Sequence, residues 1–534
     1  MQNKCEKKLC GHLIVSVVAI SIFFANISHS GVWFADMSSH ALNGVFYKDM
    51  IEEGGFFDPV RYAERYYVQY PSLTIGMYPP VFYTFEALLF KLFGVSPKVA
   101  KLAVCLFTLL GVNVFFLLCR LWFPIWLSAV GSVLYLMQPS ALFAQKNVML
   151  EMPFLTMSII AVYCLYIGTE RDRLSALFFA PLFTATAFLT RQSAIFLVPI
   201  WSSWIILRKK WWLMTSGRFI LGVLAGATIV VPWGIVNLTV GKGHLAHLNF
   251  GVSHIWPNCL FYLRHLSEVA SFPVIVLSVL SVILFHKLRY KDGYQLSLLW
   301  VCSVIVFLLP MKLSEPRYAI GLLPPLIVLS MHAIRFLKEK FTYIFQRSSI
   351  CFVVILVLIC FHIDPRKVWD SPDIQGFDQV ADFVASDLDC VSVLYDGLYN
   401  GNFIFHMRMR DKDRRVFVFR ASKVVFSTAF HLELGYNQLV KEAPEFYDVL
   451  ERYAIKYVVQ EERDSLKTPA NKSLRQWMQG PEFKLVRECR IRCRGLDGFG
   501  NLLVYEYLDY EAKPLRQIDL DMPVMERKIS VKLE

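Results

Sequence analysis

Five residues of this sequence, in four separate segments, place charged side chains at the ends of long apolar runs. Asp36 follows the first run, and Glu151 opens another in the segment NVMLEMPF. Arg191 lies in a short polar turn between two further runs, while Glu315 and Arg317 stand together in KLSEPRY. Charged groups at a membrane edge are costly to place there, and they often serve function. These five residues are therefore the first candidates for chemistry.

Gathered in one crevice, such residues suit the transfer of a group from a lipid-phosphate donor. Arginine binds phosphate through forked, charge-assisted hydrogen bonds, so Arg191 and Arg317 are the predicted phosphate ligands. An aspartate takes the proton from an acceptor hydroxyl as that hydroxyl attacks, a role that suits Asp36. A second carboxylate such as Glu151 orients the acceptor or holds a metal, so a divalent metal ion is a possible cofactor and none is certain.

Each residue also has a purely structural interpretation. Asp36 suits the N-cap of a following helix, and Glu151 suits the first turn of another, since acids offset the helix dipole there. Interfacial arginines such as Arg191 often anchor a protein to lipid headgroups. Glu315 and Arg317 are close enough in sequence to pair with each other. These alternatives stay open at the level of the sequence.

The composition indicates what kind of structural element carries these residues. Of 534 residues, 55% are hydrophobic and only 18% are charged, which is too apolar for a soluble protein of this length. The net charge of +12 does not indicate a nucleic-acid partner, because the basic residues gather beside the apolar runs. We therefore expect a polytopic α-helical protein whose surroundings are membrane lipids.

A membrane-spanning helix needs about 20 mostly apolar residues. By that measure the chain has eleven predicted spans, at 12–29, 98–118, 124–143, 152–168, 174–190, 192–207, 217–238, 271–286, 294–310, 317–334 and 349–363. The first could instead be a cleaved signal peptide, but the many spans that follow favour an uncleaved anchor. The predicted membrane domain is 1–363, and 364–534 is a soluble domain.

Basic residues fix the predicted orientation, because positive loops stay in the cytoplasm. They fall at the N-terminus and in alternate loops, at Lys4, Lys7, Lys8, Arg120, Arg171, Arg173, Arg208, Lys209, Lys210, Lys287, Arg289, Lys291, Arg335, Lys338 and Lys340. All lie on one side if the N-terminus is cytoplasmic and the soluble domain is exported. Asp36, Glu151, Arg191, Glu315 and Arg317 then share the outer face.

This topology requires that the segment 78–94, YPPVFYTFEALLFKLFG, does not span. It is short, begins with two prolines and carries Glu86 and Lys91, so we predict a helix lying on the outer surface. It belongs to a long outer loop, 30–98, in which 36–53 is a predicted helix ended by Gly54. A second outer stretch, 241–271, carries four histidines, which we expect to be solvated rather than metal ligands.

The soluble region alternates strand and helix patterns, which favours a small α/β domain. The predicted strands are 391–397, 414–420, 455–460 and 501–507, with a helix at 444–453. Cys489 and Cys493 are the two cysteines there that a short disulfide could join.

At these residues the sequence resembles the membrane-integral C-type glycosyltransferases, which include dolichyl-phosphate-mannose protein mannosyltransferases and bacterial aminoarabinose transferases of lipid A. The likeness follows the membrane region in order. It rests on the Asp36 region, MYPPVFYTFEALLFKLFGVS at 77–96, LEMPFLTMSIIAVYCLY at 150–166, AFLTRQSAIFLVP at 187–199 and SEPRYAIGLLPPLIVLS at 314–330. The stretch 395–423 is similar to the tail of bacterial members.

The resemblance implies roles for individual residues. Asp36 takes the position of the presumed catalytic base, and Glu151 that of the acid lining the same site. Many relatives have an Asp-Glu pair where this chain has Asp36-Met37, and aminoarabinose transferases have Glu-Lys where it has Met77-Tyr78. In those relatives that glutamate helps to bind a metal and that lysine the lipid phosphate.

The prediction is an inverting glycosyltransferase that moves a sugar from a polyprenyl-phosphate donor to a lipid, glycan or protein acceptor, in an expected bacterial inner membrane. Asp36 is the base, Glu151 assists, and Tyr78, Arg191, Glu315 and Arg317 bind substrate. The alternative is a transporter or flippase of a polyprenyl-linked or amphipathic substrate, which needs ionisable residues deep in the helices. A scaffold without chemistry would leave the outer cluster unexplained.

Overall fold

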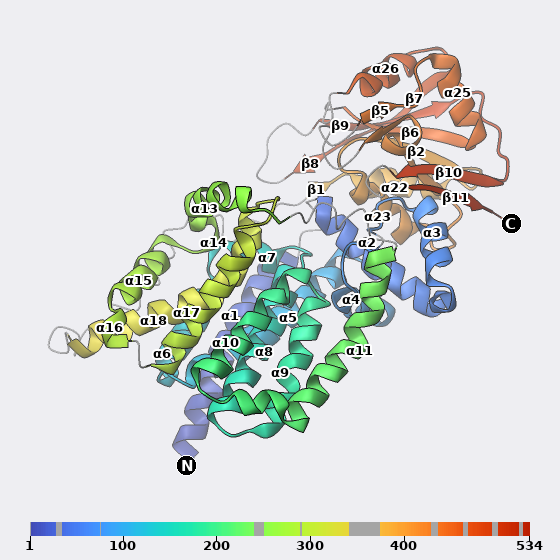
Figure 1. Ribbon diagram of the computed structural model, residues 1–534. Helices are drawn as coiled ribbons and strands as arrows, with labels where there is room; N and C mark the ends of the chain where they lie inside the picture. The colour runs from blue at the N-terminus through green and yellow to red at the C-terminus, as the bar shows by residue number, and fades with distance from the viewer. Residues whose placement is uncertain are drawn as a thin grey trace.

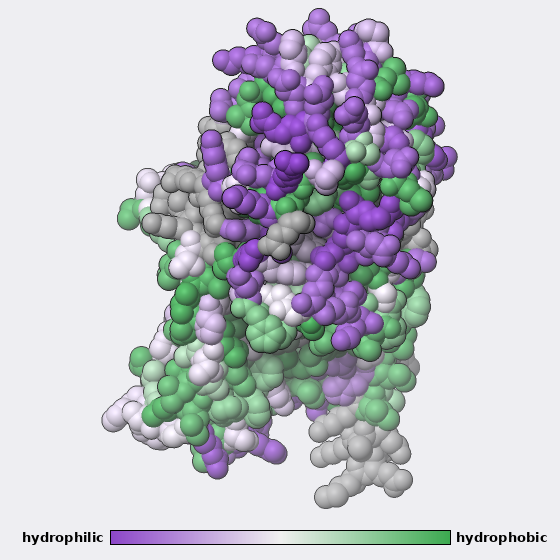
Figure 2. Space-filling view, turned by 90° about the vertical axis from the view of Figure 1, so that its right-hand side faces the viewer, coloured by the Kyte–Doolittle hydropathy of each residue, from purple (hydrophilic) through white to green (hydrophobic). Residues whose placement is uncertain are grey.

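The computed structural model describes residues 2–27, 35–74, 76–239, 250–288, 291–340, 374–428, 436–462, 468–493, 500–522 and 527–533. It has a helical part, made of α1 and residues 76–340, and an α/β part, residues 374–533. Two helices of the loop before residue 76 lie between them (Figure 1). Figure 2 shows a mainly hydrophobic surface over the helical part and a mainly hydrophilic one over the α/β part.

Apolar helices occupy every predicted span before residue 340. They are α1 (Gln2–Ile27), α5 (Pro97–Arg120), α6 (Ile125–Leu136), α7 (Pro139–Lys146), α8 (Glu151–Glu170), α9 (Leu174–Phe188), η2 (Gln192–Phe196), α10 (Leu197–Leu207), α11 (Gly217–Thr239), α15 (Phe272–Ile283), α17 (Asp292–Leu308), η5 (Pro316–Leu322) and α18 (Leu323–Lys340). Shorter helices join them, at η3 (Trp211–Thr215), η4 (Val252–His254), α13 (Ile255–Arg264), α14 (Leu266–Val269) and α16 (Phe285–Leu288).

Among the described helices, four are long and apolar enough to cross a membrane: α5, α8, α11 and the segment Pro316–Lys340. The pair α6 and α7, bent by 66°, makes a fifth if it is one broken span. The other helices at predicted spans are apolar but shorter. The predicted span 349–363 lies outside the described residues, so the count of eleven stays a prediction.

The loop 30–98 contains the two helices that the sequence predicted, at 36–53 and 78–94. α2 (Ala35–Glu52) precedes Gly54, whose φ of 70° places it in the left-handed region that favours glycine. η1 (Gly55–Phe57) and α3 (Pro59–Gln69) follow, with Asp58 capping α3. α4 (Val81–Phe93) is the predicted surface helix, and it ends at Gly94 with φ 80°. Its orientation at the membrane surface remains a prediction.

The α/β part confirms the predicted mixture of strands and helices. Its central sheet has the order β3-β2-β6-β9-β7, formed by β3 (Phe417–Arg420), β2 (Ser392–Asp396), β6 (Ile455–Glu461), β9 (Asn501–Tyr507) and β7 (Phe483–Arg490). The first three strands are parallel to one another, and β9 pairs antiparallel with β6 on one side and with β7 on the other. β2 is buried along its whole length, as the middle strand of a parallel group should be.

Helices and short strands complete the α/β part. The helices are α22 (Phe377–Ser386), α23 (Asn400–Arg410), α24 (Ala421–Val424), α25 (Ala443–Arg452) and α26 (Pro469–Trp477). The short strands pair as β1 (Ile374–Gln375) with β8 (Arg492–Cys493), β4 (Phe426–Thr428) with β5 (Tyr436–Gln438), and β10 (Gln517–Met522) with β11 (Arg527–Lys532). Cys489 is buried and its thiol is free.

Candidate active site

Arg317 joins two of the predicted carboxylates. It lies in η5, and its Nη1 donates to Oδ2 of Asp36, in the first turn of α2, at 2.7 Å. Its Nε also donates to Glu315, the residue that precedes η5. Glu315 and Arg317 therefore do pair with each other, as the structural alternative proposed, but the same guanidinium also binds Asp36. The side chains of Asp36 and Arg317 are 30% and 23% exposed, so solvent still reaches this pair.

Arg191 and Glu151 form the second ion pair. Arg191 follows α9 at the start of η2, Glu151 is the first residue of α8, and Nη1 donates to Oε1 at 2.9 Å. The carboxylate is nearly buried, and its other oxygen has no hydrogen-bond partner among the described residues. A buried oxygen without a donor is unfavourable, which leaves Glu151 with capacity to accept a bond from a ligand.

Tyr318 brings the two ion pairs side by side. The guanidinium carbon of Arg191 lies 5.2 Å from the centre of the Tyr318 ring, and that of Arg317 lies 5.8 Å from the same centre. Both distances allow cation–π attraction, which favours keeping two like charges close together. The structure thus gathers all five charged residues that the sequence analysis singled out.

His40 lies one helical turn after Asp36, where the charges of both ion pairs act on it. The imidazole is buried, its Nδ1 is 2.7 Å from the hydroxyl of Tyr83, and its ring packs edge-on against Tyr78. Burial lowers the pKa of His40 to about 4, although the charges of Asp36 and Glu151 act to raise it. The imidazole is therefore neutral at physiological pH, so it offers one donor and one acceptor without adding charge.

Tyr78, the predicted substrate-binding tyrosine, belongs to a turn that three other segments hold in place. The amide of Asn237 donates to the carbonyl of Gly76 at 2.7 Å, and that of Gln192 donates to the carbonyl of Met77 at 3.4 Å. The backbone N–H of Val81 donates to the carbonyl of Leu189 at 3.1 Å. Burial raises the pKa of the Tyr78 phenol, which therefore stays protonated.

Three aromatic or imidazole side chains of this site were not predicted: His40, Tyr318 and Tyr262. The hydroxyl of Tyr262 is buried without a hydrogen-bond partner among the described residues. Burial raises its pKa, and the charges of Arg191 and Glu315 also act on it. Tyr262 lies in α13, within the stretch 241–271 whose four histidines were expected to be solvated. Of those, His254 and His265 are described, and His265 bonds Glu268 at 2.6 Å.

A divalent metal does not fit this donor set. Asp36 and Glu151 are each occupied by an arginine, and the neighbouring positions 37 and 77 hold methionines, which offer a hard divalent cation no oxygen ligand. Within the described ranges no three His, Cys, Asp or Glu side chains are grouped so that they could hold a metal ion. The positive charges of this site are guanidinium groups instead.

Comparison with solved structures identifies the architecture. ArnT from Cupriavidus metallidurans bound to undecaprenyl phosphate matches with a TM-score of 0.60 at 14% identity, covering 94% of this chain and 99% of that one. This chain has the GT-C fold. The apo oligosaccharyltransferase of Archaeoglobus fulgidus matches at 0.54 and 10% identity, over 85% and 69% of the two chains. The arabinofuranosyltransferase AftD from Mycobacteria matches at 0.54 and 11%, over 96% and 41%.

Sequence comparison agrees for part of the GT-C fold. Residues 77–235 match the family described as dolichyl-phosphate-mannose-protein mannosyltransferase, and this range contains Tyr78, Glu151 and Arg191. Asp36 and Arg317 fall outside it and reach the site only through the fold. No curated protein matches the sequence. The family resemblance read from the sequence is confirmed, and the integral membrane character follows from the fold and its apolar helices.

Proposed function

We propose that this protein is an inverting glycosyltransferase that takes a sugar from a polyprenyl-phosphate carrier. The observation that carries the proposal is the pairing of two arginines with two carboxylates at helix ends, around one tyrosine. Two guanidinium groups suit a phosphate monoester or diester, and the adjacent carboxylates suit proton acceptance. The similarity to ArnT, whose structure holds undecaprenyl phosphate, supports a donor of this chemical class.

In the proposed reaction the acceptor hydroxyl attacks the anomeric carbon of the sugar. Asp36 accepts the hydroxyl proton as the new carbon–oxygen bond forms. The bond between the anomeric carbon and the phosphate oxygen breaks, and its electron pair leaves with the polyprenyl phosphate. Arg191 and Arg317 stabilise the charge that develops on that phosphate. Attack from the face opposite the leaving group inverts the anomeric centre.

The ion pair between Arg317 and Asp36 implies that donor binding precedes proton transfer to Asp36. While the pair is intact, Oδ2 of Asp36 accepts a hydrogen bond from the guanidinium and is not open to the acceptor hydroxyl. A donor phosphate that binds Arg317 competes with Asp36 for the same N–H groups. Donor binding therefore frees Asp36 to act as the base, with His40 and Tyr78 packed beside it. Glu151, with its unpartnered oxygen, orients the acceptor.

We place the site on the outer face of the membrane, with eleven spans and an exported α/β part, on the basis of the basic loops. A bacterial inner membrane, and a lipid, glycan or protein acceptor, complete the proposal. A transporter or flippase is the competing function, and it calls for ionisable groups near the membrane centre. The position of the two ion pairs at helix ends favours transfer.

The test supplies purified full-length protein, in lipid nanodiscs, with a panel of polyprenyl-phosphate sugars, alone and with candidate acceptors. We expect one donor to be consumed in the presence of an acceptor, with inversion of the anomeric configuration in the product. If no donor is consumed, but the intact carrier crosses the bilayer of reconstituted vesicles, the transporter hypothesis replaces this one.

A further inference from the structure

Helix α2, which carries Asp36, belongs to two hydrophobic cores at once. Met37, Ala41 and Val45 pack into the core of the helical part. Leu42 and Phe46, on the neighbouring stripe of the same helix, pack into the core of the α/β part. α23 has the reverse arrangement, because its Phe405 is buried in the core of the helical part. Both α2 and α23 therefore contribute side chains to the two hydrophobic cores.

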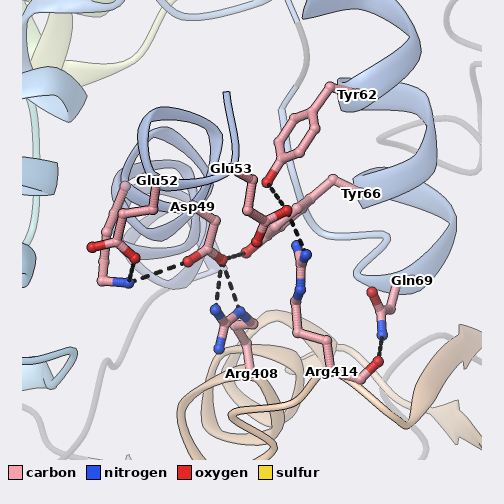
Figure 3. A network of polar contacts seen from close by, with 9 residues as sticks. Asp49, Glu52, Glu53, Tyr62, Tyr66, Gln69, Arg408 and Arg414 are labelled. Atoms are coloured by element: carbon pink, nitrogen blue, oxygen red, sulfur yellow. Dashed lines mark hydrogen bonds and ion pairs between the residues drawn. The ribbon is translucent and has the colours of Figure 1, made fainter. Parts of the chain in front are cut away.

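The far end of α2 is fastened by a buried ion pair, shown in Figure 3. Oδ2 of Asp49 accepts bonds from Nε and Nη2 of Arg408, on α23, at 2.9 and 2.7 Å. The hydroxyl of Tyr66 donates to the same oxygen at 2.8 Å. Asp49 is 2% exposed and Arg408 is 10% exposed at the side chain. A forked, buried pair of this kind holds a fixed geometry, and losing either partner leaves a buried charge.

A second ion pair crosses the same interface nearer to solvent. Nη2 of Arg414 donates to Oε2 of Glu53 at 2.5 Å, and the hydroxyl of Tyr62 donates to the same carboxylate at 3.0 Å. Because Arg414 and Glu53 are 24% and 39% exposed, this pair is more strongly screened than the first. It lies in the same close-up view and provides an internal comparison for the buried pair (Figure 3).

The near end of α2 is fixed by a close approach of the Gly401 backbone to two serine side chains. A side-chain Cβ at Gly401, in the first turn of α23, would lie 2.2 Å from Oγ of Ser38 and 2.9 Å from Oγ of Ser72. Ser38 is two residues after Asp36, in the first turn of α2. The glycine therefore allows the α/β part to touch the turn that presents the candidate base.

We propose that the α/β part positions Asp36 through α2, with Arg408 and Gly401 as positioning residues. Asp36 and Asp49 are 13 residues apart, so the helix links the two fastened ends over about 20 Å. Gly401 determines how closely α23 approaches the first turn of α2, and Arg408 determines the direction of the α2 axis. Asp36 is then held where Arg317 reaches it and where a donor phosphate displaces it. This inference rests on the proposed function of Asp36 as the base.

The experiment compares full-length G401A, S38G and the double variant in nanodiscs. We expect G401A to lower kcat by about tenfold or more while KM for the donor changes by less than about twofold, since small misplacements of a reacting group are costly. S38G removes the nearer of the two side chains that the new methyl group meets, so the double variant should recover part of the kcat that G401A loses. S38G alone supplies the baseline rate for this comparison, because Ser38 is itself buried in the first turn of α2. A purely stabilising role of the interface would not produce this split between kcat and KM.

A second measurement follows hydrogen–deuterium exchange of the α2 amides. G401A and R408K should exchange faster over residues 36–42, whereas R414K, at the solvent-exposed pair, should match the wild type. Folded G401A and R408K proteins with wild-type kcat and wild-type exchange would overturn the proposal, as would a lost kcat that S38G does not restore even in part. If the wild type consumes no polyprenyl-phosphate sugar, the proposed function fails, and the exchange result still decides the positioning role.

Discussion

Arg317 donates a 2.7 Å hydrogen bond to Asp36 across 281 residues of sequence. The same guanidinium donates to Glu315, so one cation serves two carboxylates. A third acceptor, such as a donor phosphate, would compete for a guanidinium that two carboxylates already engage through Nε and Nη1. The expected consequence is that phosphate binding and release of the Asp36 carboxylate occur together.

Replacing Asp36 by asparagine should therefore abolish transfer but not donor binding. The amide cannot take up the acceptor proton, and we expect kcat to fall by about 10³-fold, within the range that a general base contributes. Donor affinity should be unchanged or higher, because Arg317 loses a competitor. Steady-state rates and equilibrium binding of a polyprenyl-phosphate sugar measure the two effects. E52Q, at the exposed end of the same helix, is the matched control; full activity of D36N would exclude the base role.

Arg191→Lys tests the second ion pair while keeping its charge. Lysine cannot form the planar fork or stack on Tyr318 in the same way, so KM for the donor should rise by about tenfold, equivalent to roughly 1.4 kcal/mol. R264K changes an exposed arginine at the end of α13 in the same manner and should leave KM unchanged. Equal KM values for R191K and wild type would remove Arg191 from the phosphate site.

Glu86 in α4 is fully buried, and neither carboxylate oxygen has a hydrogen-bond partner among the described residues. Burial raises its pKa well above the usual value, so the folded protein keeps this group protonated. In the unfolded chain the Glu86 carboxyl ionises above about pH 4.5, whereas the folded protein keeps it protonated. The stability of the fold is therefore lost progressively as the pH rises above about 4.5. E86M should therefore raise Tm at pH 7.5 by a few degrees, and by less at pH 5. L88M, an exposed position on α4, should have no such effect, and a lower Tm for E86M would contradict this explanation.

Glu461 should make the stability of the α/β part depend on pH. Burial raises its pKa to about 7, against bonds donated by the Tyr395 hydroxyl at 2.6 Å and the Tyr399 N–H at 2.7 Å. The folded state binds more protons than the unfolded state between about pH 4.5 and 7, so stability falls with rising pH by up to about 3 kcal/mol. E461Q should flatten the dependence of Tm on pH between 5 and 8. The exposed neighbour substitution E462Q should retain the wild-type slope; an unchanged slope in E461Q would rule out this carboxyl as its source.

Chelation should leave transfer unaffected. Because arginines occupy Asp36 and Glu151, we expect dialysis against EDTA to change kcat by less than about twofold, whereas removal of a required metal would cost far more. Rates are measured before and after chelation, and again after adding Zn²⁺ or Mg²⁺. Recovery of a lost rate by either ion would show that a metal site forms when the donor binds.

The sequence analysis predicted the charged residues of the site because apolar runs and basic loops reveal which helix ends share a face. Asp36, Glu151, Arg191, Glu315 and Arg317 all meet for that reason. Their separation into two ion pairs was not predictable, since it depends on how α2 and η5 approach each other. Four strands of the central sheet, β2, β3, β6 and β9, were likewise predicted from local patterns. The fifth, β7, was missed because FKLVRECR has polar residues on both faces, and the shorter pairs β1–β8, β4–β5 and β10–β11 were not predicted.

Residues whose roles depend on their buried surroundings could not be predicted from the sequence. A single histidine four positions after Asp36 has the same local pattern as any helical histidine, and only its environment makes His40 neutral. Tyr262 comes from a separate helix, α13, and reaches the site by tertiary packing. The contact between Asp49 and Arg408 spans 359 residues and leaves no periodic signal. The assignment of 30–98 to the membrane domain and 364–534 to a separate one stays a prediction.

The shared helix has a consequence for how such proteins change during evolution. An α/β part exchanged without α2 and α3 would leave Leu42 and Phe46 facing a surface that no longer matches them. It would also leave the buried carboxylate of Asp49 without its guanidinium partner. The heritable unit is therefore discontinuous: the loop near the N-terminus and the C-terminal tail must change together, although most of the chain lies between them.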